Sequence, residues 1–284
     1  MRSSLALFIL FLVAVIWGLT FPILKISLQF ISPMGFISLR FFLAFLLLLI
    51  IFREKREDMK VALKAGFIIG IFLFLGHLFQ TVGLKYTTAS HAGFITGLYV
   101  VFTPIFAWIF LRERISVKII LAVIISTFGL YLLSNYEGKP NIGDFLTLLG
   151  AIAYALQVVS VGKYSRIYDP SAITVVELGT VFLFSTVGWG VEGLPISLTP
   201  PLILGVSFVG IVATALAILM QTHAQKLVAA SQAVIFYTAE PVFAGIFSYF
   251  LLGETLSISG MVGAFLILLG MLLVSLDRSH PTPQ

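Results

Sequence analysis

Ten apolar stretches, each long enough to cross a lipid bilayer, constrain the fold more than any other feature of this sequence. A bilayer core about 30 Å thick needs roughly 20 apolar residues in a helix, and apolar residues make up 60% of the 284. Charged residues make up only 10%, too few to cover the surface of a water-soluble protein. Inside a bilayer the backbone must satisfy its own hydrogen bonds, which favours helices. We therefore expect an all-α integral membrane protein with ten transmembrane helices, at residues 5–26, 33–52, 62–82, 90–111, 118–135, 143–162, 171–189, 201–222, 229–252 and 257–276.

The positive charges predict how the chain is oriented. Lys and Arg side chains gather in the connections on one side of the predicted spans, from Arg2 to Arg278, while Lys85 and Lys139 fall on the other side. Positive loops remain in the cytoplasm, so both termini are expected there, with the chain in the cytoplasmic (inner) membrane. The net charge of +5 then reflects topology rather than a nucleic-acid partner.

The sequence matches itself at a fixed shift. Residues 83–116 align without gaps over residues 224–257, a shift of 141, and Glu113 then falls on Glu254. Further upstream the shift becomes 137. Because each half contains five predicted helices, an odd number, the second half must enter the membrane from the opposite side. We expect two inverted five-helix repeats, at residues 1–136 and 137–284.

Four short motifs resemble a known family. They are Trp17-Gly18…Lys25, Pro33…Arg40, Leu111-x-Glu113-x-Ile115-Ser116 and Glu240-Pro241-Val242-Phe243…Leu252-Gly253-Glu254-Thr255. Together they resemble the EamA-type transporters of the drug/metabolite transporter (DMT) superfamily, over essentially the whole chain. The resemblance implies ten helices in two repeats, a cavity between them, and export or sometimes uptake of small metabolites such as amino acids. The first half departs from the motif at Arg112, where a glycine is usual.

Polar and aromatic residues at matching positions of the two halves are the candidates for substrate binding. Side chains that face an internal cavity can be polar because water or substrate satisfies them, whereas polar groups facing lipid cost several kcal/mol. Hydrogen bonding between helices would give the same sequence pattern. The candidates are Trp17, Thr20, Gln80, Thr96, Tyr99, Tyr154, Gln157, Gln221, Tyr237 and Glu240.

Four ionisable residues lie inside predicted helices, where each charge costs about 2.5–3.5 kcal/mol. Arg40 and Glu177 are counterparts under the shift of 137 and predict an ion pair across the two halves, although both could instead extend to the headgroups. Glu240 precedes a helix-breaking proline, and an ordinary histidine such as His77 changes charge near neutral pH. Glu240 and His77 are therefore the candidates for proton coupling, with a structural carboxylate and a packed histidine as the alternatives.

These features favour a secondary transporter that moves an amino-acid-like or amphiphilic metabolite, as an exporter working by alternating access. Pro22, Pro104 and Pro241 are its candidate hinges, and we expect the prolines of helices 90–111 and 229–252 to give similar but not equivalent hinges. Two alternatives stay open. One is a flippase for a lipid carrier or lipid-linked glycan, and the other is a membrane-embedded enzyme built on Glu240 and His77.

Motifs for other functions are absent from the sequence. There is no nucleotide-binding Gly-rich loop, and no catalytic or metal-binding motif is recognisable. Cysteine is also absent. We expect no enzyme activity, no cofactor and no metal, a small-molecule substrate, the lipid bilayer as the surroundings and a possible homodimer through the apolar helices 118–135 and 257–276.

Overall fold

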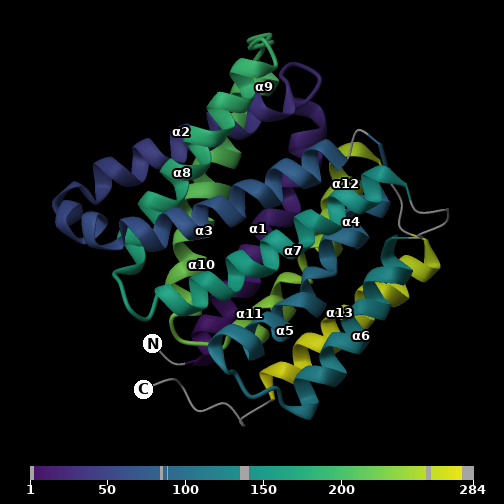
Figure 1. The fold of residues 1–284 in the computed structure, drawn as a ribbon. Coiled ribbons are helices and arrows are strands. Elements are labelled where there is room, and N and C mark those ends of the chain that lie inside the picture. The colour runs from purple at the N-terminus through teal and green to yellow at the C-terminus, as the bar shows by residue number, and fades with distance from the viewer. Residues whose placement is uncertain (1–2, 84–85, 88, 135–140, 254–256, 277–284) are drawn as a thin grey trace.

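The computed structural model describes residues 3–83, 86–87, 89–134, 141–253 and 257–276, and they form a bundle of helices (Figure 1). Ten helical segments are long and apolar enough to span a membrane, which confirms the predicted number. Their elements are α1 (Ser3–Ser27), α2 (Pro33–Ile51), η1 (Arg53–Lys55), α3 (Arg56–Gly83), α4 (Ala89–Gly97), α5 (Tyr99–Leu111), α6 (Val117–Ser134), α7 (Ile142–Tyr164), α8 (Pro170–Val191), α9 (Pro200–Phe208), the π-helix η2 (Val209–Leu216), α10 (Ala217–Gln225), α11 (Ala230–Tyr237), α12 (Glu240–Leu252) and α13 (Ile258–Ser275).

Local sequence signals explain where several of these helices begin. The Asn141 side chain accepts hydrogen bonds from two amides of the first turn of α7, and Asp144 returns a bond to the Asn141 amide. Asp169 caps α8 in the same way through the amide of Ala172, ahead of a proline whose missing N–H costs nothing at that position.

Counterpart helices of the two halves make matching contacts in the bundle. Helix α1 packs on α12, and its counterpart α7 packs on α5. Helices α6 and α13, the fifth span of each half, pack along each other at one side of the bundle (Figure 1). A Cβ on Gly129 would crowd Ile267, and a Cβ on Gly270 would crowd Ser126. Both pairs of counterparts are 141 residues apart, so the contact is the same one made twice.

The fourth and ninth spans are each broken in the middle, at equivalent places. Helix α5 begins at Tyr99 and α12 begins at Glu240, again 141 residues apart. At both breaks the chain makes a tight i→i+3 bond, from the Leu98 amide to the Ile95 carbonyl at 3.1 Å and from the Ala239 amide to the Phe236 carbonyl at 3.3 Å.

The two breaks correct the sequence-based expectation about the hinges. Pro241 lies in the first turn of α12, as expected for a proline at a break, but Pro104 lies inside α5. A proline disturbs the turn before it, and Leu98 is too far upstream for Pro104 to be the cause. The prolines are not equivalent, while the breaks are.

The same left-handed turn ends α5 and α12. Gly253 follows α12 with φ 71°, and its counterpart Arg112 follows α5 with φ 54°. Glycine adopts this conformation freely, whereas a residue with a side chain pays about 1–2 kcal/mol. The first half therefore carries backbone strain that the second half avoids.

Candidate functional site

Polar side chains from three helices form a first network in the interior. The Tyr154 hydroxyl on α7 lies 2.9 Å from His77 Nδ1 and donates to Gln80 Oε1 at 3.1 Å. Gln80 Nε2 donates to the Thr96 hydroxyl at 3.1 Å. Because the tyrosine has one proton and gives it to Gln80, His77 Nδ1 must carry the proton of the other bond. All four side chains are half-buried.

A second network is closed to solvent. Gln157 Nε2 donates to Glu177 Oε1 at 2.8 Å, and Gln221 Nε2 donates to Gln157 Oε1 at 3.4 Å. Gln221 also donates to Gln225, which accepts a bond from the Tyr237 hydroxyl at 3.2 Å. Gln157, Gln221 and Tyr237 are at most 3% exposed. In this structure their polar atoms bind one another, which is the interhelical bonding that the sequence pattern also allowed.

The structure does not bring Arg40 and Glu177 together as an ion pair. The Glu177 carboxylate turns to Gln157, and its Oε2 has no partner among the described residues. Arg40 Nε donates to the Thr214 hydroxyl at 3.1 Å, and the guanidinium lies 5.0 Å from the centre of the Phe41 ring. Although α2 and α8 pack together, the two side chains point to different neighbours.

The charged neighbour of Arg40 is Glu240. Arg40 and Glu240 lie within electrostatic range of each other and of Tyr154, yet no ion pair within 4.0 Å joins the two charged groups. Glu240 is half-buried and is the first residue of α12, just as its electrostatic neighbour Tyr99 is the first of α5. The two half-helix N-termini, whose dipoles favour negative charge, therefore contribute Glu240 and Tyr99 to one region.

The π-helix η2 supplies polar groups that the sequence did not reveal. The indole Nε1 of Trp17 donates to the Ala213 carbonyl at 3.0 Å, and the Trp17 ring lies 5.4 Å from that of Tyr237. The Thr214 hydroxyl donates to the Val209 carbonyl of the same wide turn at 2.8 Å and also accepts the bond from Arg40. Thr20 bonds locally to the Trp17 carbonyl. A π-turn inside a helix often marks a functional position.

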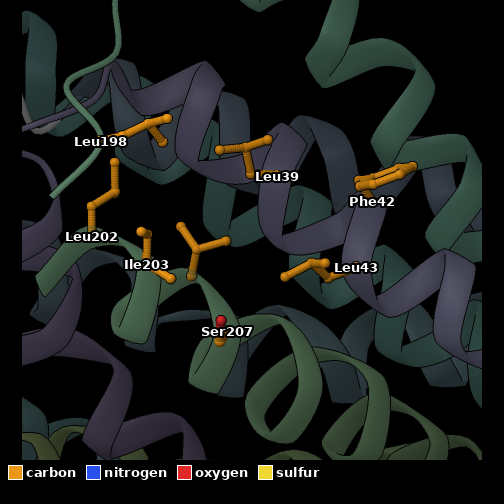
Figure 2. A pocket seen from close by; sticks show the side chains of 8 residues that line it. Leu39, Phe42, Leu43, Leu198, Leu202, Ile203 and Ser207 are labelled. Carbon is orange, nitrogen blue, oxygen red and sulfur yellow. The ribbon is translucent and has the colours of Figure 1, made fainter. Parts of the chain in front are cut away.

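Two grooves lie away from these networks. One of about 250 Å³ runs between α2 and α9, and Figure 2 shows leucine, isoleucine and phenylalanine side chains around it, together with Ser207. The other, of about 730 Å³, opens at the end of α5. Among the described residues no group of His, Asp or Glu could hold a metal ion.

A contact between the two halves was missed by the sequence analysis. Glu113 follows α5 in the first half and accepts bonds at the start of α11 in the second half. Its donors are the Ala230 amide at 3.0 Å, the Ser231 amide at 3.3 Å and the Ser231 hydroxyl at 2.9 Å. Arg166 lies within electrostatic range and donates to the Val228 carbonyl at 3.0 Å. The signal was the glutamate present in both halves; its counterpart Glu254 lies outside the described residues.

Comparisons with known proteins agree with this architecture. The family model described as EamA-like transporter family matches residues 4–135 and again residues 141–276. An "uncharacterized transporter" of Archaeoglobus fulgidus is 38% identical over 265 residues, which cover 93% of this chain and 84% of that protein. The "uncharacterized transporter YvbV" of Bacillus subtilis is 27% identical, over 96% of this chain and 92% of that protein. A crystal structure with 17% identity superposes with a TM-score of 0.77 over 96% of each chain, which shows the shared fold.

Proposed function

The chain belongs to the EamA-like transporter family, and from this premise we propose that it is a secondary transporter for a small zwitterionic metabolite. The observation that carries the proposal is the pair Arg40 and Glu240. The two opposite charges lie within electrostatic range of each other but form no ion pair. An unpaired charge inside a membrane is costly, so such charges usually serve a function.

A zwitterion would satisfy both charges at once. Its carboxylate would bind the Arg40 guanidinium and its ammonium the Glu240 carboxylate, with the half-buried Trp17 and Tyr154 beside an apolar side chain. This arrangement supports an amino-acid-like substrate. Trp17, Thr20, Gln80, Thr96, Tyr99, Tyr154 and Glu240 stay as the proposed binding residues, while Gln157, Gln221 and Tyr237 would act from behind them.

The transport cycle that we propose is alternating access. Its support is the pair of breaks at Tyr99 and Glu240, which give each half a helix that can bend at the same level. Export is the proposed direction, and the cytoplasmic membrane with both termini in the cytoplasm is the proposed location. In keeping with this, α1 begins and α13 ends on the same side of the bundle (Figure 1).

Counterflow in proteoliposomes, with α-amino acids as the probes, tests the substrate class. Glu240→Gln and Arg40→Gln should each lower the affinity for an amino acid at least tenfold, which is the usual effect of leaving one charge of a bound pair without its partner. The matched control is Glu177→Gln, whose binding should stay within about twofold of wild type, because the glutamine oxygen can keep the bond from Gln157. The affinity for amines that lack a carboxylate should be the same in Arg40→Gln as in wild type. If the folded Arg40 and Glu240 variants bind the whole panel as the wild type does, the zwitterion assignment is wrong.

Proton exchange is the proposed driving force, with Glu240 or His77 as the carrier. Acidifying one side of the proteoliposome should change the flux of wild type and leave the flux of Glu240→Gln or of His77→Gln unaffected. A wild-type flux that ignores the pH difference would remove proton coupling and leave the substrate's own gradient.

The alternatives find less support in the geometry. A flippase needs a charged path that leads a headgroup from one end of the bundle to the other. The groove between α2 and α9 is lined by apolar residues and Ser207 (Figure 2), and the charged lining of the other groove is confined to the end of α5. An enzyme built on His77 and Glu240 needs the two side chains in contact. The His77 ring instead binds the Tyr154 hydroxyl, and no hydrogen bond between His77 and Glu240 is present among the described residues.

A further inference from the structure

The groove at the end of α5 is lined by two arginines, Arg112 and Arg114, that have no partner in the part of the chain that the structure describes. Arg112 and Arg114 are both exposed, and no described residue accepts a hydrogen bond or forms an ion pair with either guanidinium. Glu113 stands between them, but its two oxygens already accept the bonds from the start of α11. Among the described residues that line the groove, two arginines against one glutamate leave an excess of positive charge, and neither guanidinium binds the glutamate.

The groove also has an apolar wall. Trp108 and Ile109, in the last turns of α5, line it and are 62% and 52% exposed. Tryptophan at the end of a membrane span sits at the level of the lipid headgroups. A soluble anion would contact the arginines alone, whereas a phospholipid would place its phosphate on them and its chains along Trp108 and Ile109.

Arg112 adopts a backbone conformation that favours glycine. Its φ is 54°, and the equivalent residue of the other half is Gly253. Nothing in the turn itself needs an arginine, because Gly253 completes the same turn without one. Strain that persists in one of two equivalent turns points to a role for the side chain.

We propose that this groove binds an anionic phospholipid of the surrounding leaflet, with its phosphate held between Arg112 and Arg114. Guanidinium groups bind phosphate oxygens in pairs of hydrogen bonds, which suits two arginines on one rim. Trp108 lies against the glycerol region, and Ile109 lies along an acyl chain. The site is separate from Arg40 and Glu240 and does not depend on the transported substrate.

Thermal unfolding and native mass spectrometry of the purified full-length protein in detergent test the site. Phosphatidylglycerol should raise the unfolding temperature of wild type more than phosphatidylcholine does. Arg112→Gly should unfold at a higher temperature than wild type without lipid, because the strain is gone. It should also bind phosphatidylglycerol about tenfold more weakly, since one charged contact is lost.

Two further variants, and inorganic phosphate as a soluble probe, complete the test. Arg114→Gln should weaken phosphatidylglycerol binding without raising the lipid-free unfolding temperature. Arg53→Gln, an exposed arginine at the start of the third span, is the matched control and should bind the lipid as wild type does. The proposal is overturned if Arg112→Gly keeps the wild-type affinity for phosphatidylglycerol, or if inorganic phosphate stabilises wild type as much as the lipid does.

Discussion

Removing the charge of Glu113 should open the protein on the side where α11 begins. Glu113 is the first-half residue that holds the start of α11, through two backbone amides and one hydroxyl. We expect these bonds to form when that side is closed and to break when it opens. Glu113→Gln therefore destabilises one state of the transport cycle more than the other.

The magnitude follows from the bonds that a glutamine can keep. Its single carbonyl oxygen can replace Oε2 and accept from the amide and hydroxyl of Ser231, but its NH2 group then faces the Ala230 amide. One charge-assisted bond and the favourable charge at a helix N-terminus are lost, together about 2 kcal/mol. The ratio of open to closed molecules should rise roughly 30-fold.

Spin labels can measure this ratio without background, because the natural sequence has no cysteine. One label at Val117→Cys and one at Lys226→Cys, both exposed, stand on the two sides of the contact. Double electron–electron resonance should show more of the long distance in Glu113→Gln than in wild type. Ser231→Ala should shift the distribution less, since it removes the hydroxyl bond alone.

Glu57→Gln is the control for the loss of a carboxylate elsewhere, because Glu57 is exposed and forms an ion pair with Lys60 on its own helix. It should leave the distances unchanged. A Glu113→Gln protein that folds, transports and shows the wild-type distance distribution would falsify the view that this contact closes one side.

Three further variants test the interior and one helix cap. A Cβ at Gly76 would lie 2.5 Å from the Tyr154 ring, so Gly76→Ala should lower the free energy of unfolding by about 1–3 kcal/mol in thermal unfolding. Gly93→Ala is the control, because a Cβ there would have no atom within 4 Å, and it should not lower the stability. Tyr154→Phe removes the bonds to His77 and Gln80 and should weaken substrate binding roughly three- to tenfold in counterflow, whereas the exposed Tyr131→Phe should bind normally. Burial would raise the pKa of Asp169, but bonds from Lys55 and the Ala172 amide hold it below the ordinary 3.8. The Asp169 carboxylate therefore contributes its full stabilisation at neutral pH and loses it as the pH falls through that lowered pKa. Asp169→Ala should lower the free energy of unfolding by about 1 kcal/mol at pH 7 and leave it unchanged in strong acid, as measured by unfolding at the two pH values.

The number of spans and the internal repeat were predictable, because both depend on patterns that survive in a single sequence. Length and hydropathy specify a membrane helix, and Glu113 over Glu254 in one register specifies the repeat. Side-chain partners were less predictable. The counterparts Arg40 and Glu177 suggested a pair, but the partner of Arg40 depends on η2, where a π-turn rotates Thr214 toward it. No periodicity in the sequence marks that turn.

The positions of the two helix breaks were also not predictable from the sequence. Proline is the sequence signal for a kink, and it led to the expectation of two unequal hinges at Pro104 and Pro241. The structure has equivalent breaks before Tyr99 and Glu240. Pro241 stands at the second break, but no proline stands at the first, so a proline alone does not set the position of the break.

Residues that are the same in both halves and residues that differ between them have different roles in the proposed transporter. Positions on which the halves agree, such as Gly129 and Gly270, make the scaffold, because a two-fold contact needs the same residue twice. A zwitterion has no two-fold symmetry, so a symmetric site could not bind its two ends differently. The charged residues of the proposed site stand where the halves differ, with Glu240 opposite Tyr99 and Arg40 opposite Glu177. Replacing Tyr99 by Glu would restore symmetry at one of these positions, and the resulting protein should bind cations in place of zwitterions.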